Sequence, residues 1–155
     1  MTLSVEQRSA LSDVVHRYAA YVDDREFNAA AELFTDDAEL LVPAPPADLQ
    51  PVRSHRGRRA IGMAVAAVAT VARTEHAIIG EVYDAAAADT ARGRIAGVAH
   101  HWNERDGELV DVAWHLRYDD EYVLTGAGWR IGRRALTVHA IETRPVRRLL
   151  PPDAS

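Results

Sequence analysis

The sequence predicts an α+β domain in which three helices precede an antiparallel sheet. Apolar residues in the first half of the chain recur at helical spacing, whereas the second half contains long strand-like runs separated by turn residues. The 155 residues match the size of one ordinary domain with its own core. Helices packed on one face of a curved sheet would bury both sets of apolar residues.

Three helical segments are predicted before residue 73. Ser4 and Gln7 fit a capping box, and the first helix is expected to run from there to about Asp24. Its apolar stripe comprises Leu11, Val14, Val15, Tyr18, Tyr21 and Val22. A short second helix is expected over 28–34, and an alanine-rich third helix over 57–72.

A strand over 38–42 and a long loop over 43–51 are expected between the second and third helices. The loop is predicted because its prolines interrupt regular structure, and long loops in compact domains often act as lids. Further strands are expected over 76–83, 91–103, 109–124 and 129–141. The predicted domain covers 1–144, and an extended tail is expected over 145–155.

The composition excludes several kinds of chemistry. All 18 basic residues are arginines, which excludes Schiff-base chemistry and a lysine phosphate clamp. The absence of cysteine excludes disulfides, thiol nucleophiles and thiolate metal sites. A net charge of -5 argues against a nucleic-acid partner, and neither a membrane-spanning run nor a signal peptide is recognisable. We therefore expect a cytoplasmic protein that binds neither nucleic acid nor membranes.

An aspartate and a histidine far apart in sequence are the main candidates for chemistry. Asp23 lies near the end of the first helix, where a negative charge opposes the helix dipole and needs another reason to be present. His76 opens an apolar strand. A carboxylate that orients an imidazole makes a general base near neutral pH. The alternative is a solvated aspartate and a core histidine that never meet.

The adjacent pair His100 and His101 resembles a metal motif, but neighbouring strand residues point to opposite faces. Only one of them can therefore enter a pocket. His101 shares its face with the small residues Gly93, Gly97 and Ala99, which leave room for a ligand or for a packed helix. No glycine-rich phosphate loop and no Cys–His metal spacing is present, so neither a cofactor nor a metal is expected.

The order of elements resembles that of the SnoaL-like branch of the nuclear transport factor 2-like superfamily. The segments that carry the resemblance are 18–27, 33–38, 74–76, 117–122 and 128–131. The resemblance covers roughly Leu3 to Arg144 and implies a cone-shaped fold whose helices and bent sheet enclose a deep pocket. This fold hosts dehydratases, isomerases, cyclases, epoxide hydrolases and non-catalytic binders. The resemblance therefore predicts the fold more specifically than the function.

The site pattern is most similar to those of scytalone dehydratase, bile acid dehydratase and lindane dehydrochlorinase, which are cofactor-free eliminases with an Asp–His pair. The resemblance places the family aspartate on Asp23 and the family histidine on His76. A second histidine of the scytalone type falls on His101, or on His100 after a shift of one residue. The bile acid enzyme departs from this pattern, because it has an aspartate there. The dehydrochlorinase has an arginine where this chain reads Leu124-Thr125-Gly126.

Further candidates surround this pair. Tyr18 matches a tyrosine of the bile acid enzyme and could donate to a leaving oxygen. Arg134 matches the pocket arginine of that enzyme, and a buried arginine would suit an anionic substrate oxygen. Tyr118 and Trp114 are expected on the pocket wall, with ordinary core packing as the alternative.

The predicted function is a cofactor-independent lyase of the dehydratase type, or an isomerase, in a homodimer or homotrimer. Its substrate is expected to be small, hydrophobic and cyclic, like a polyketide or steroid. His76, oriented by Asp23, would remove a proton, while Tyr18 and His101 would stabilise or protonate the departing oxygen. The alternatives are a non-catalytic binding or assembly module, and the small subunit of an aromatic-ring dioxygenase with a larger iron-bearing partner.

Overall fold

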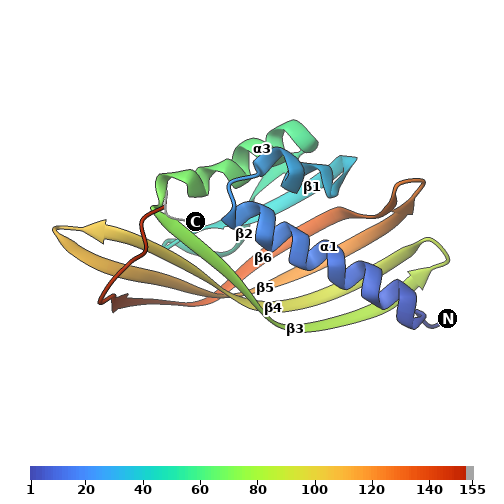
Figure 1. The fold of residues 1–155 in the computed structure, drawn as a ribbon. Helices are drawn as coiled ribbons and strands as arrows, with labels where there is room; N and C mark the ends of the chain where they lie inside the picture. The colour runs from blue at the N-terminus through green and yellow to red at the C-terminus, as the bar shows by residue number, and fades with distance from the viewer. Residues whose placement is uncertain (153–155) are drawn as a thin grey trace.

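A curved six-stranded sheet with helices on one side makes up the protein (Figure 1). The computed structural model describes residues 1–152. The α-helices are α1 (Val5–Asp23), α2 (Phe27–Glu32) and α3 (Arg58–Val65), and the 3-10 helix η1 (Ala66–Thr70) follows α3. The strands are β1 (Phe34–Ala44), β2 (Asp48–Arg56), β3 (Arg73–Ala87), β4 (Thr90–Arg105), β5 (Glu108–Thr125) and β6 (Gly128–Pro145). The predicted α+β class and the three α-helices are confirmed within the described residues.

Local hydrogen bonds cap both ends of α1. The predicted capping box is present, with the Gln7 amide donating to Ser4 Oγ and the Ser4 amide donating to Gln7 Oε1. At the other end, two backbone bonds form a Schellman-type motif with Arg25 in the left-handed region at φ 64°. This ending makes Asp23 the last helical residue and turns the chain away directly after it.

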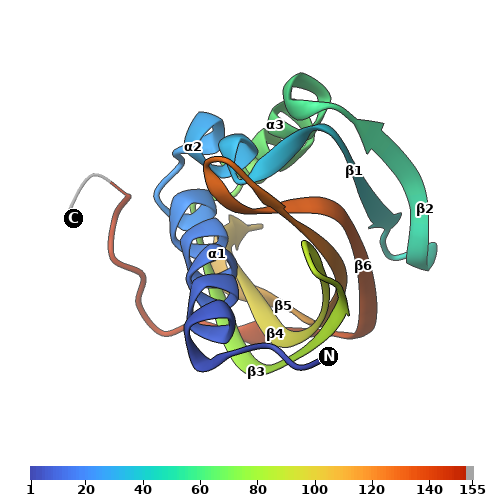
Figure 2. The same ribbon diagram turned by 90° about the vertical axis from the view of Figure 1, so that its right-hand side faces the viewer.

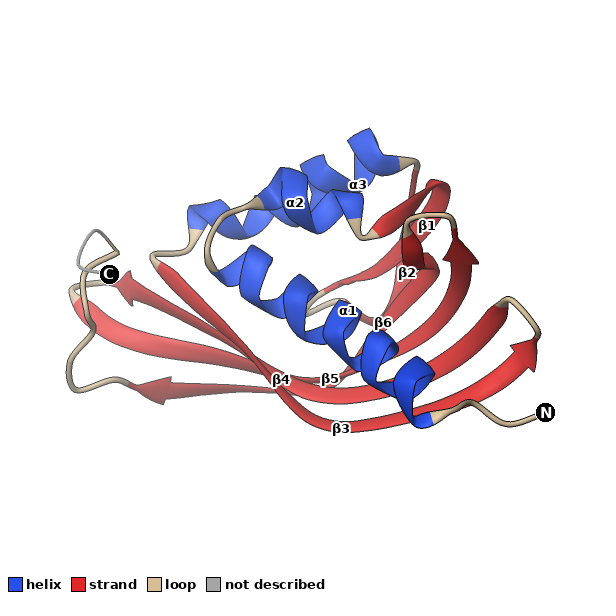
Figure 3. Cartoon of the chain, turned by 45° about the vertical axis from the view of Figure 1, so that its right-hand side comes forward, coloured by secondary structure: helices blue, strands red, loops and turns tan. Residues whose placement is uncertain are grey.

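The sheet has the strand order β2-β1-β6-β5-β4-β3. β1 runs parallel to β6, and all other neighbours are antiparallel. The sheet bends round from β3 to β1, and the helices occupy the open side of the bend (Figure 2). Figure 3 shows α1 lying across the strands, with α2 and α3 above it. Fully buried residues from both layers form the core, including Leu11, Val15, Ile61, Ile95 and Ile131.

The predicted long loop over 43–51 is wrong, because β1 and β2 form a hairpin there. β1 continues to Ala44, β2 begins at Asp48, and only a short turn separates them. The hairpin tolerates its prolines for two reasons. β2 is an edge strand, so the sheet does not need every backbone amide of β2 as a donor, and the register of the β1–β2 pair shifts around Pro43. The hairpin replaces the expected lid by a wall of two strands.

Other boundaries also differ from the prediction. The second helix ends at Glu32, and Phe34 already belongs to β1. The third helix stops at Val65 because η1 and an extended segment lead into β3, which starts three residues before His76. After Pro145, residues 146–152 form neither helix nor strand, and 153–155 of the predicted tail lie outside the described residues. Within residues 1–152, no helix has the length and apolar character needed to cross a membrane.

Candidate active site

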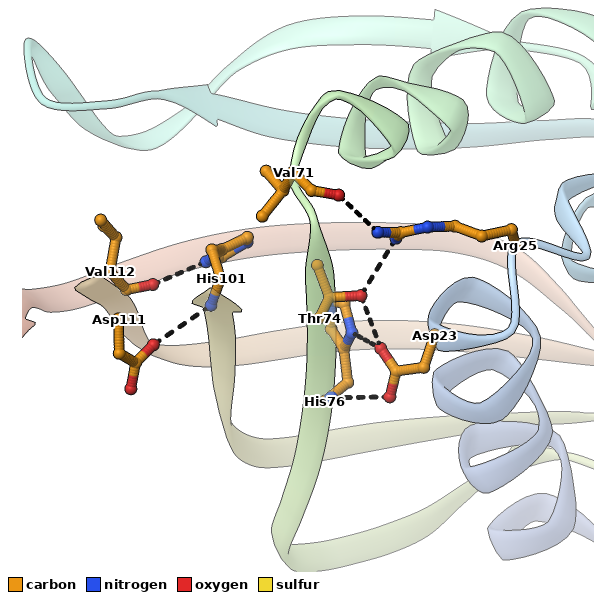
Figure 4. Close-up of polar contacts among 8 residues, drawn as sticks. All are labelled: Asp23, Arg25, Val71, Thr74, His76, His101, Asp111 and Val112. Atoms are coloured by element: carbon orange, nitrogen blue, oxygen red, sulfur yellow. Dashed lines mark hydrogen bonds and ion pairs between the residues drawn. The ribbon is translucent and has the colours of Figure 1, made fainter. Parts of the chain in front are cut away.

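Asp23 and His76 lie side by side at the junction of α1 and β3 (Figure 4). His76 Nδ1 lies 2.6 Å from Asp23 Oδ1, and the His76 amide donates to Asp23 Oδ2 at 2.8 Å. The His76 and Asp23 side chains are only 11% and 19% exposed. The carboxylate therefore binds both the ring and the backbone of the same histidine, which fixes the position and the rotation of the imidazole.

A second layer of side chains holds the carboxylate in place. Thr74 is buried and donates from Oγ1 to Asp23 Oδ1 at 3.0 Å. Arg25 donates to Thr74 Oγ1 at 3.2 Å and to the Val71 carbonyl at 2.7 Å. Figure 4 shows the chain of contacts from Val71 through Arg25 and Thr74 to Asp23. Thr74 and His76 reach the same carboxylate because alternate residues of β3 point to the same face.

The Asp23 contact selects the tautomer of His76. An ionised carboxylate can only accept a hydrogen bond, so Nδ1 carries the proton and Nε2 of the neutral ring carries a lone pair. Nε2 has no hydrogen-bond partner among residues 1–152. The free nitrogen of His76 is therefore available as a base.

His101 lies on the neighbouring strand β4, with its ring centroid 6.4 Å from that of His76. Its Nδ1 is 2.8 Å from the Val112 carbonyl, so Nδ1–H donates and Nε2 of the neutral ring can only accept. Burial lowers the pKa of His101, although the hydrogen bond to the Val112 carbonyl opposes the shift. The neutral form of His101 is thus favoured, and this form does not donate a proton from Nε2.

A cavity of about 420 Å³ opens between the helices and the concave face of the sheet. Its wall is largely apolar and includes Val22, Leu40, Val65, Val68, Trp114, Leu116 and Leu136. His76, His101, Tyr18 and Tyr118 also line it. The structure thus brings five of the sequence-predicted site residues, Trp114 included, to one apolar space, with Asp23 directly behind His76.

Tyr18 and Tyr118 line the cavity, and their rings also contact the buried guanidinium of Arg134. Arg134 is fully buried and makes a bidentate contact with Asp120, with Nε–Oδ1 and Nη2–Oδ2 distances of 2.8 and 2.6 Å. Its guanidinium carbon lies 4.4 Å from the Tyr18 ring centroid and 4.1 Å from that of Tyr118. Burial raises the pKa of Tyr18 and of Tyr118, although Arg134 opposes the shift, so both hydroxyls remain donors at neutral pH.

Arg134 and His100 do not line the cavity. Arg134 lies beneath the tyrosines, and His100 points to the opposite face of β4, where its Nδ1 is 2.7 Å from Asp111 Oδ2 and its ring stacks on Trp102. Strand alternation places only His101 inside. The expectation that His100 contacts a ligand in this cavity is therefore wrong, and Arg134 contacts the rings of two tyrosines that line the cavity.

Four residues around the site were missed by sequence reasoning. Arg25 and Thr74 support Asp23, and Arg53 and His55 of β2 line the cavity. Arg53 and His55 carry a signal, since they alternate as cavity-facing residues of a strand do, but the prolines before them predict a loop. Among residues 1–152, no group of three or more histidine, aspartate or glutamate side chains converges to hold a metal ion.

A protein family also matches this chain. The SnoaL-like domain family matches residues 3–135, and the chain belongs to this family. Among curated protein sequences, none matches the chain.

Solved structures of the nuclear transport factor 2-like fold superpose on most of the chain. A candidate scytalone dehydratase from Novosphingobium aromaticivorans has a TM-score of 0.74 at 24% identity, covering 95% of this chain and 93% of its own. A hexachlorocyclohexane dehydrochlorinase has a TM-score of 0.75 at 16% identity, with coverage of 96% and 95%. A candidate aromatic ring hydroxylase from the same Novosphingobium species has a TM-score of 0.76 at 22% identity, with coverage of 93% and 96%. At these identities the likeness establishes the shared fold.

Proposed function

We propose that this chain is a cofactor-independent lyase that eliminates water or a similar small leaving group from a small, apolar, cyclic molecule. The observation that carries the proposal is the Asp23–His76 pair, because His76 lines a largely apolar cavity and Asp23 holds its Nδ1. The fold neighbours support it, because one is named as a dehydratase and another as a dehydrochlorinase, and both reactions are eliminations.

The proposed reaction begins with proton removal by His76. Nε2 takes a proton from a carbon made acidic by a neighbouring carbonyl group, and the electrons of the broken C–H bond form the new double bond. The bond between the next carbon and its hydroxyl group breaks, and the departing oxygen takes the proton back from the imidazolium. Water leaves and His76 regains its starting form. Asp23 stabilises the transient positive charge on the ring.

The other polar groups of the cavity complement this step. Tyr18 and Tyr118 remain protonated and can donate hydrogen bonds to the carbonyl oxygen, where negative charge develops. His101, in its neutral form, accepts a hydrogen bond at Nε2 and can orient a hydroxyl group of the substrate. An isomerase would share the first step and differ only in returning the proton to another carbon.

A panel of cyclic β-hydroxy ketones tests the proposal, with the conjugated product followed by its ultraviolet absorbance. Asp23→Asn and His76→Gln should each lower kcat by about 1,000-fold or more, because the first change disturbs the tautomer and the second removes the base. His115→Gln is the matched control, since His115 also contacts a carboxylate, Glu142, but is absent from the cavity wall. Its kcat should equal that of the unmodified protein.

Thermal unfolding must show that the inactive variants are folded. Full turnover by both Asp23→Asn and His76→Gln would refute the mechanism. Saturable binding of panel compounds without any product would instead favour a non-catalytic binding module.

A further inference from the structure

The edge strand β2 places two basic side chains in the cavity wall. Arg53 and His55 are separated by one residue and therefore point to the same face of the strand. They pair with Val42 and Leu40 of β1, which line the cavity as well. Arg53 is exposed and His55 is half-buried, so this part of the wall lies towards solvent.

Among the residues that the structure describes, no acidic side chain compensates the charge of Arg53. Its neighbours Arg56 and Arg58 contact the carboxylates of Glu39 and Asp36, respectively. Arg53 has no hydrogen-bond or ion-pair partner among residues 1–152, and no aspartate or glutamate lines the cavity. A guanidinium at the edge of an apolar cavity without a carboxylate nearby favours a negatively charged ligand group at that position.

The basic pair and the proposed base belong to the two opposite edge strands of the sheet. β2 and β3 are the two edges of the sheet, and side chains of both strands line the cavity. His76 lies on one edge and Arg53 on the other, with the apolar side chains of Leu40, Leu136 and Leu116 on the strands between them. A ligand that fills the cavity would contact both His76 and Arg53.

We propose that the cavity binds an amphipathic carboxylic acid, with its apolar body against the sheet and its carboxylate on Arg53. The guanidinium can donate two parallel N–H···O bonds to a carboxylate, and His55 can supply a further donor. One guanidinium and one imidazole match a monoanion. This inference names the substrate class of the proposed lyase and rests on that function for the reaction at the His76 end, but the binding itself requires no turnover.

Calorimetry with naphthoic acid and its neutral amide tests the inference, since the two probes share their apolar part and differ in charge. The unmodified protein should bind the acid about tenfold more tightly than the amide, as expected for a charge-assisted hydrogen bond near solvent. Arg53→Gln should remove this preference and leave the affinity for the amide unchanged. Arg59→Gln is the matched control, because Arg59 is an exposed arginine of α3 that does not line the cavity.

The dependence of binding on salt is a second test. Added sodium chloride should weaken the binding of the acid but not of the amide. Equal affinities of the unmodified protein for acid and amide would overturn the inference, as would a preference that survives in Arg53→Gln. The result is independent of the proposed lyase function. A charge preference without any elimination activity would refute the lyase alone, and elimination without a charge preference would refute the carboxylate site alone.

Discussion

Arg25 adopts a left-handed backbone conformation, which costs a residue with a Cβ atom about 1–2 kcal/mol. Glycine would fit this position after α1 better. The side chain of Arg25 gives a reason for the choice, because it donates to Val71 and Thr74, and Thr74 donates to Asp23. We infer that Arg25 is a positioning residue that acts on the base through Thr74 and Asp23.

Arg25→Gly should separate this positioning role from stability. Glycine adopts the left-handed conformation at position 25 without strain, and this gain offsets the loss of the Arg25 side-chain contacts. The free energy of unfolding should therefore change by less than about 1 kcal/mol. We expect kcat to fall about tenfold while KM stays unchanged, since the aspartate loses part of its support and the cavity wall does not change. Urea unfolding and steady-state kinetics measure both quantities, and Arg25→Lys should restore part of kcat. An unchanged kcat in Arg25→Gly would show that the contact is only structural.

At the residue scale, the sequence predicted the side chains that we propose for the chemistry, but not the residues that support them. Asp23, His76 and His101 are conspicuous by residue type and by the resemblance, and the structure brings all three to one place. Arg25 and Thr74 are ordinary polar residues in sequence. Their contacts depend on the left-handed turn after α1 and on the early start of β3, and neither feature was predictable from spacing.

At the element scale, β3 and β4 approach each other closely at Gly97. A Cβ atom on Gly97 would lie 2.7 Å from the backbone oxygen of Ala77, which belongs to the paired strand. A backbone atom in a sheet cannot move aside as a flexible side chain can. The close approach therefore fixes the spacing of the two strands that carry His76 and His101.

Gly97→Ala should destabilise the protein by about 1–3 kcal/mol, because the added methyl group forces β3 and β4 apart. Urea unfolding measures the change in the free energy of unfolding. Gly80→Ala is the control on β3, since a Cβ atom there would meet only the side chain of Ala96 at 4.0 Å. Equal stabilities of the two variants would contradict the close approach at Gly97.

The elements themselves differed in how well their sequences predicted them. The long strands β4, β5 and β6 carry an alternation of small or apolar with polar residues. Each of them contains the whole residue range that was predicted for it. The β1–β2 hairpin was not predicted, because its prolines indicate a loop and the alternation of Arg53 and His55 is too short a signal for a strand. An edge strand tolerates prolines that a central strand would reject, but edge position is a property of the whole sheet.

At the scale of the whole molecule, a buried ion pair ties the helical layer to the sheet. Arg134 and Asp120 lie on neighbouring strands, and the guanidinium is enclosed by Tyr18 of α1 and Tyr118 of β5. Although burial disfavours its charged form, Asp120 holds the pKa of Arg134 above its usual value. The arginine that the resemblance assigned to the pocket therefore forms the support beneath two tyrosines that face the cavity.

The bend of the sheet and the end of α1 together bring Asp23 and His76 into contact across 53 positions of sequence. Such long-range contacts follow from the topology and not from local patterns, and the family resemblance was therefore the only route to them from sequence. The central claim is that this pair removes a carbon-bound proton from a ligand in the cavity. It can be tested without the natural substrate.

The most direct measurement is the exchange of carbon-bound hydrogen in tetralone, an apolar cyclic ketone, dissolved in D₂O and followed by proton NMR. His76 would remove a proton beside the carbonyl group, exchange it with solvent and return a deuteron. The unmodified protein should accelerate this exchange by about 100-fold or more over buffer, and Asp23→Asn and His76→Gln should reduce it to the background rate. No acceleration by the unmodified protein, or equal acceleration by both variants, would contradict the claim.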